Sequence, residues 1–99
     1  MQQDLERYAL VIASKKTGKV KKFVHGYMKS MLKIWAMRFL KPSENAVLVC
    51  CTDGHIEARF SGNKNGWTHP EDLSEQSLYV DEVLLIAILE SDDYHVEDL

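Results

Sequence analysis

The segment NAVLVCCTDGHIEARF, residues 45–60, predicts two β-strands joined by a tight turn. Asp53-Gly54 is a strong hairpin signal, because a type I′ turn needs a positive φ at both central residues. With Thr52 paired to His55, alternate side chains share one apolar face. That predicted core face holds Val47, Val49, Cys51, Ile56, Ala58 and Phe60. The other face, which carries Cys50 beside Glu57, is mixed.

An earlier hairpin is predicted at residues 7–26. RYALVIAS is rich in β-branched residues, KKTG supplies a loop with Gly18, and KVKKFVHG returns as the second strand. A four-residue loop pairs Ser14 with Lys19 and sets Leu10 opposite Phe23. The hairpin then has one largely apolar face and a lysine-rich turn.

Between the hairpins, YMKSMLKIWAMRFLK has a helical period, which predicts a helix over Met28–Leu40. Pro42 ends it, because the residue before a proline avoids the α region. Residues at three- and four-residue spacing form the predicted core anchors: Met28, Met31, Leu32, Trp35 and Phe39. A basic, methionine-rich helix is also typical of membrane-surface and calmodulin-target helices, but strands that need cover favour the core interpretation.

The last third of the chain is harder to interpret. Thr68 and Glu71 have capping-box spacing, which predicts a helix from there to about Tyr79. The run VLLIAIL, residues 83–89, fits either a helix or a buried strand, since seven consecutive apolar residues show no period. We favour a strand in the middle of the sheet.

These elements predict an α+β fold. Two β-hairpins form an antiparallel sheet, and one amphipathic helix packs on one face, in the order β-β-α-β-β. A short helix follows, with a possible fifth strand. Residues 1–90 are expected to form a single compact domain, and residues 91–99 an acidic C-terminal tail.

Charge is segregated along the chain. Residues 1–41 carry a balance of +8 and residues 42–99 a balance of −11, which give the net charge of −3. Such a split suggests opposite electrostatic faces or halves that attract each other. No apolar run approaches the roughly 20 residues that cross a bilayer, and Asp4 and Glu6 precede the first apolar run instead of a basic leader. We therefore expect a cytoplasmic protein with reduced cysteines and no membrane partner.

Cysteine, histidine and carboxylate residues do not form a familiar site. Consecutive strand residues point to opposite faces, so Cys50 and Cys51 cannot both bind one zinc ion, and His25, His55, His69 and His95 are scattered. Phosphate-loop, nucleophile-elbow and metalloprotease motifs are absent. The sequence thus predicts no enzyme, no catalytic or metal-binding residues and no cofactor.

The most substantial candidate site is basic. Five lysines of the first hairpin could contact nucleic acid or another anion: Lys15, Lys16, Lys19, Lys21 and Lys22. Two functions remain open. The preferred one is a small non-enzymatic protein-interaction module, with a protein partner or a homo-oligomer. The alternative is an RNA- or single-stranded-DNA-binding module that uses the lysine-rich hairpin, although such domains are usually basic overall.

Overall fold

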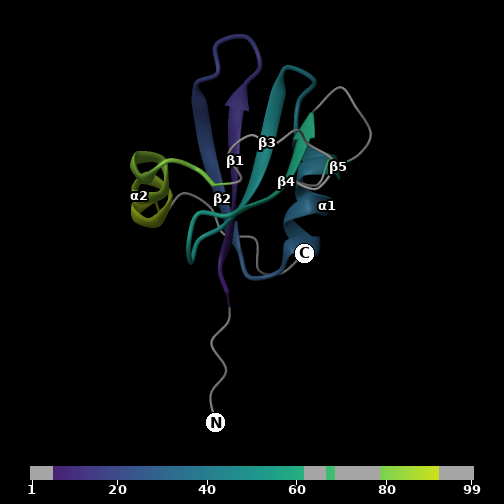
Figure 1. Cartoon of the computed structure of the whole chain (residues 1–99). Helices are drawn as coiled ribbons and strands as arrows, with labels where there is room; N and C mark the ends of the chain where they lie inside the picture. The colour runs from purple at the N-terminus through teal and green to yellow at the C-terminus, as the bar shows by residue number, and fades with distance from the viewer. Residues whose placement is uncertain (1–5, 62–66, 69–78, 92–99) are drawn as a thin grey trace.

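A computed structural model describes residues 6–61, 67–68 and 79–91 of the chain. These residues form five strands and two helices (Figure 1). In chain order the elements are β1 (Tyr8–Ser14), β2 (Val20–Gly26), α1 (Lys29–Phe39), β3 (Glu44–Cys50), β4 (Ile56–Ser61), β5 (Trp67–Thr68) and α2 (Glu82–Glu90).

The strands form one antiparallel sheet in the order β2-β1-β3-β4-β5. β1 lies between β2 and β3, so these two strands run parallel to each other on either side of it. α1 joins them by crossing one face of the sheet. The predicted α+β fold, with two hairpins and a helix in the order β-β-α-β-β, is confirmed.

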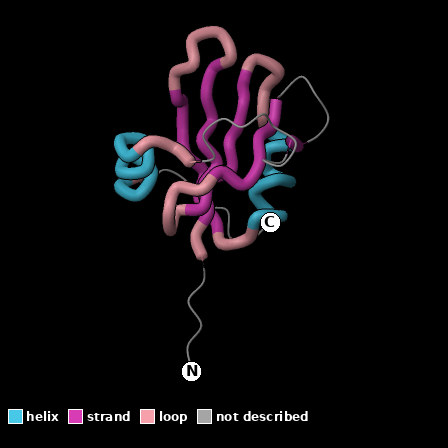
Figure 2. The backbone as a smooth tube through the Cα atoms, viewed as in Figure 1, coloured by secondary structure: helices cyan, strands magenta, loops and turns pink. Residues whose placement is uncertain are grey.

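Helices cover both faces of the sheet, α1 on one side and α2 on the other (Figures 1 and 2). Each helix has its own apolar core. The α1-side core contains Leu10, Ile12, Val24, Leu32, Trp35, Ala36, Ala46, Leu48, Ala58 and Phe60. The α2-side core contains Ala9, Val11, Val49, Cys51 and Ile88. The described chain is therefore a three-layer structure.

Helix α1 begins and ends close to the predicted bounds, but its buried face differs from the predicted stripe. Leu32 and Trp35 are buried and Met31 is half-buried, whereas Met28 and Phe39 are 55% and 56% exposed. The prediction was wrong for these two. Met28 is the extended N-cap residue before the helix, and Phe39 lies in the last turn, where its ring meets that of Trp35.

The first hairpin has the predicted pairing at its turn and a different one beyond it. Ser14 donates its backbone N–H to the carbonyl of Lys19, as expected. A β-bulge then inserts Lys21, so that Leu10 pairs with Val24 and not with Phe23. A one-residue shift moves each later side chain to the opposite face. Val24 therefore joins the α1-side core, and Phe23 packs against the α2-side core.

The second hairpin has a longer turn than predicted. Cys50, not Thr52, pairs with His55, and only Gly54 has a positive φ, of 82°. A type I′ turn is therefore excluded, since it needs positive φ at two residues. The faces predicted for this hairpin were wrong as a result. Leu48 pairs with Ala58 inside the α1-side core. Val47 and Val49 point to the α2 side instead.

The strand expected around residues 83–89 is a helix, α2. Asp81 caps it, since its carboxylate accepts a hydrogen bond from the backbone N–H of Leu84 at 2.7 Å. Instead of entering the sheet, the run covers its second face through Ile88 and Leu84. Thr68 belongs to β5. Tyr79, the expected end of that helix, instead forms an isolated β-bridge with His55. Residues 69–78 of the predicted helix and residues 92–99 of the predicted tail at 91–99 lie outside the described residues.

Gly54 lies in the second turn, where it packs against side chains of α2 and of the residues just before it. Replacing it with alanine should therefore lower the stability of the fold. A Cβ there would lie 3.2 Å from Val80 Cγ2 and 3.3 Å from Leu85 Cδ2, at a φ that L residues rarely adopt. Gly18 is a matched control, because its φ is +74° but nothing lies within 4 Å. We expect Gly18→Ala to lose about 1–2 kcal/mol of unfolding free energy from φ alone.

Gly54→Ala should lower the free energy of unfolding by about 1–3 kcal/mol more than Gly18→Ala does, since this is the usual cost of overpacking. Both variants change the unfolded chain equally, so urea melts of the two isolate the packing of α2 on the turn. Equal losses would mean that α2 does not press on Gly54.

Candidate functional site

The five lysines of the first hairpin do not form one patch. Lys16 and Lys19 are exposed around the turn, and Lys15 is half-buried there. Lys21 forms an ion pair with Glu44 at 2.7 Å, and Lys22 Nζ lies 5.3 Å from the centre of the Trp35 ring. The structure thus separates the turn lysines from a pair that faces α1.

The β-bulge explains why Lys21 and Lys22 act together. Neighbouring residues of a regular strand point to opposite faces of the sheet. The bulge places an extra residue at Lys21, because Ile12 pairs with Lys22 and Ala13 with Val20. Both lysines consequently line the same hollow, which we call the basic hollow.

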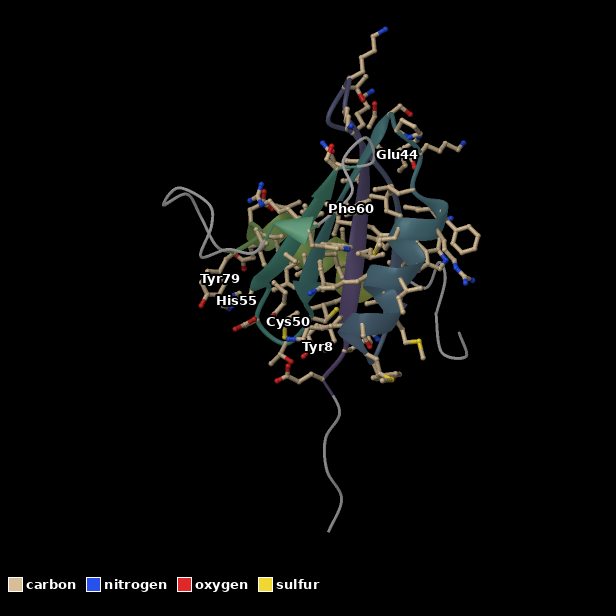
Figure 3. All side chains as sticks on the ribbon, turned by 90° about the vertical axis from the view of Figure 1, so that its right-hand side faces the viewer. Tyr8, Glu44, Cys50, His55, Phe60 and Tyr79 are labelled. Atoms are coloured by element: carbon tan, nitrogen blue, oxygen red, sulfur yellow. The ribbon has the colours of Figure 1, made fainter. Side chains whose placement is uncertain are left out.

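The basic hollow lies where the open end of the sheet meets the C-terminal end of α1, near the residue labelled Glu44 in Figure 3. Its volume is about 480 Å³. The described residues that line it come from three strands, a helix and the connection after the helix: Ile12, Lys21, Lys22, Trp35, Phe39, Lys41 and Glu44. Of these, only Lys21 and Lys22 belong to the site predicted from sequence.

Glu44 organises the polar wall of the hollow. Although nearly buried, it accepts hydrogen bonds from Lys21 Nζ at 2.7 Å and from the backbone N–H of Lys41 at 3.0 Å. The hydrogen bond from Lys21 lowers the pKa of the Glu44 carboxyl below its usual range, against the opposing effect of burial. Glu44 is therefore a carboxylate at neutral pH. Among the described residues that line the hollow, three are lysines and one is this acid.

Two aromatic rings form the apolar wall of the hollow. Trp35 lies within the core, whereas Phe39 is largely exposed, and their ring centres are 5.2 Å apart at 44°. This contact fixes the Phe39 ring while leaving much of it open to solvent. The described wall of the hollow therefore combines lysine side chains with an accessible aromatic ring.

Helix α2 presents an apolar surface to solvent. We define its outer face by the residues that point away from the sheet: Glu82, Val83, Ile86, Ala87, Leu89 and Glu90. Val83 is 79% exposed, and Ile86 and Leu89 are each 48% exposed. Only the glutamates near the two ends of this face are charged. A helix that is apolar all round is normally buried.

Helix α1 also has an apolar outer face, with the opposite charge. Ile34 and Met37 are exposed at three-residue spacing, and Lys33 and Arg38 flank them. Lys33 Nζ lies 5.8 Å from the centre of the Trp67 ring, and Arg38 is exposed. The outer face of α1 is thus apolar and basic, whereas that of α2 is apolar and acidic.

The cysteines show no sign of an activated nucleophile. Both are free thiols and buried. Cys51 packs in the α2-side core, where burial raises the pKa of its thiol. Cys50 Sγ donates a hydrogen bond to a carboxylate oxygen of Glu6 at 3.6 Å. Sequence reasoning missed this contact, because Glu6 and Cys50 meet only when β1 pairs with β3.

Glu6 also accepts a hydrogen bond from the Tyr8 hydroxyl at 2.9 Å. Burial, followed by this bond and the charge of Glu6, raises the pKa of Tyr8 to about 12. The hydroxyl therefore stays protonated and is a poor base at neutral pH. Tyr8 and Cys50 are labelled next to each other at the lower end of the sheet in Figure 3.

Among the described residues, no group of three or more His, Cys, Asp and Glu could hold a metal ion. No helix in the described part of the chain is long and apolar enough to span a membrane. Neither a protein-family model, nor a curated protein, nor a solved structure matches this chain. Its candidate function therefore depends on the outer faces of the two helices.

Proposed function

We propose that the chain is a small, non-enzymatic protein-interaction module that self-associates. The outer face of α2 in one copy packs on the outer face of α1 in the next. The exposed apolar surface of α2 is the observation that carries this proposal. We also propose a cytoplasmic location, which suits the two free thiols.

The apolar residues of α2 supply the driving force. Burying one large apolar side chain fully is worth about 1.5–3 kcal/mol. Val83, Ile86 and Leu89 lie within two turns of one short helix, so a single partner surface covers all three. The sheet cannot bury them, because Leu84 and Ile88 already occupy the side of α2 that faces it.

Charge complementarity supports a second copy that presents α1 as the partner. Glu82 and Glu90 border the outer face of α2, and Lys33 and Arg38 border that of α1. Like charges across an interface are costly and opposite charges select the partner. Two α2 faces packed together would oppose acid with acid, whereas α2 on α1 opposes acid with base. The charge segregation seen in the sequence then has a role in assembly.

This arrangement joins different surfaces that lie on opposite sides of the sheet (Figure 1). An interface between two different patches leaves one patch unused at each end, so copies add to a chain or close into a ring. We therefore expect the mass to rise with concentration beyond that of a dimer, either without limit for an open chain or up to the mass of a closed ring.

Replacing Val83 with glutamate tests the surface. It puts a charge on the outer face of α2, in the first turn of the helix, without touching the α2-side core, so Val83→Glu should remain folded and monomeric. Light scattering after gel filtration should give 11.4 kDa for the variant and a larger, concentration-dependent mass for the wild type. A circular dichroism melt confirms that the variant is folded.

Val20→Glu is the matched control, since Val20 is an exposed valine on the edge strand β2, outside both helix faces. It should assemble like the wild type. A wild type that stays at 11.4 kDa up to millimolar concentration, or equal loss of assembly in both variants, would overturn the proposal.

A further inference from the structure

We infer that the outer face of α1 is a receptor for short acidic amphipathic helices carried by other proteins, and that such a helix ends the growth of the assembly. The inference rests on the proposed contact between α2 and α1, and it names a further class of partner for the same surface. A partner of this class presents apolar side chains on one side of a helix and carboxylates at the border of that side.

The α2 outer face is a linear motif. All of its residues lie within one nine-residue helix, Glu82–Glu90. Its exposed apolar residues Val83, Ile86 and Leu89 follow one another at three-residue spacing, which places them on one side of the helix. The proposed contact therefore needs one side of a short helix and no other part of the copy that donates it. Another protein can carry the same motif on a helix of similar length.

The α1 outer face offers what such a helix requires. Ile34 and Met37 are exposed one turn apart, and amphipathic helices dock through apolar anchors at this spacing. Lys33 and Arg38 lie beside them, so the border of the face is basic. Opposite charges select a partner and like charges reject one. The face consequently favours helices with acidic borders over helices with basic ones.

A foreign helix on α1 blocks further growth. In an open chain of copies joined by α2 on α1, the copy at one end presents an unused α1 face. A foreign helix bound there offers no α1 face of its own, so no further copy can add at that end. α1 and α2 lie on opposite sides of the sheet, so the bound helix leaves the α2 contact of the same copy intact (Figure 1). An excess of the helix competes with α2 for every α1 face.

The probe is a peptide of residues 79–91 in which the side that faces the sheet is replaced. Leu84→Lys and Ile88→Asp, joined by a lactam bridge, hold the helix, because an isolated helix of this length is marginal in water. Leu85→Gln removes the third apolar residue of that side. The outer face is unchanged, and circular dichroism confirms that the bridged peptide is helical.

The Val83→Glu variant is the receptor for this peptide, because its own α2 face is blocked and its α1 face is unchanged. Adding Met37→Glu should weaken binding by about tenfold or more, the affinity carried by one buried large apolar side chain. Adding Val20→Glu is the matched control, since it puts the same charge at an exposed apolar residue outside α1, and it should leave binding unchanged. Fluorescence anisotropy of the labelled peptide compares the three proteins.

A second measurement uses the wild-type chain at a concentration where it assembles. An excess of the bridged peptide should lower the mass found by sedimentation velocity toward 11.4 kDa. The same peptide with Ile86→Glu keeps the bridge and the length but interrupts the apolar side. It should leave the mass of the assembly unchanged.

Failure of the inference is distinguishable from failure of the proposed self-association. A wild type that assembles while the helical peptide does not bind the Val83→Glu variant overturns the inference alone. Equal peptide binding after Met37→Glu and after Val20→Glu also overturns it, because the peptide then does not use the α1 face. A wild type that stays at 11.4 kDa up to millimolar concentration overturns both proposals.

Discussion

Trp35→Ala should lower the free energy of unfolding by about 3–5 kcal/mol, the range for removing a large core aromatic. Trp35 is 7% exposed and lies in the α1-side core. Its removal would leave a cavity between α1 and the sheet that Leu32 and Ala36, one turn or less away, are too small to fill. The cation–π contact of Lys22 would be lost as well.

Phe39→Ala is the control for this prediction. Phe39 is in the same helix and contacts the same ring, but most of it is exposed. Its loss should cost about 0.5–1.5 kcal/mol, the worth of an aromatic pair. Urea denaturation followed by circular dichroism compares the two variants. If Trp35→Ala is no less stable than Phe39→Ala, α1 does not pack on the sheet as described.

Ile88→Ala should also be strongly destabilising, by about 2–5 kcal/mol. Ile88 is fully buried, and it attaches α2 to the second face of the sheet. Ile86→Ala is a close control, because it makes the same change in the same helix at a side chain that is half exposed. In the monomer it should cost less than about 1 kcal/mol, since little area is removed from water.

For assembly the order should be reversed: Ile86→Ala should weaken self-association more than Ile88→Ala does. Ile86 belongs to the outer face of α2, so its truncation should weaken self-association, whereas Ile88 points to the sheet. Denaturation at low protein concentration measures the free energy of unfolding of the monomer. Gel filtration at high concentration measures self-association. Equal stability of Ile88→Ala and Ile86→Ala would show that α2 does not cover the sheet.

Local signals in the sequence predicted much of the fold. The apolar period of α1 and the proline after it located the helix to within one residue at each end. Gly18 and Gly54 marked the two hairpin turns, and both have positive φ. Such features act over a few residues, which is why sequence alone reveals them.

Register and burial were predicted less well, because they depend on contacts between distant segments. A β-bulge adds one residue without changing composition, so nothing in KVKKFVHG shows that Lys21 is the extra residue. The apolar run at residues 83–89 had no period to separate helix from strand. Asp81 was the missed signal, because an aspartate directly before such a run can cap a helix.

The candidate sites were only partly predictable for the same reason. Lys21 and Lys22 could be read from the lysine-rich hairpin, but their separation from Lys16 and Lys19 depends on the bulge. Lys41 and Phe39 join them only because α1 ends beside the hairpin. The outer face of α2 could not be predicted while the segment was assigned to a buried strand.

Mixing two charge-swapped variants tests the proposed interface between α2 and α1 most directly. One variant carries Glu82→Lys and Glu90→Lys on α2, and the other carries Lys33→Glu and Arg38→Glu on α1. Each alone opposes like charges at the interface, so sedimentation velocity should find each one monomeric. The equimolar mixture restores opposite charges at every contact, and it should assemble as the wild type does. A mixture that remains at 11.4 kDa, or a single variant that assembles as well as the mixture, would contradict association of α2 with α1.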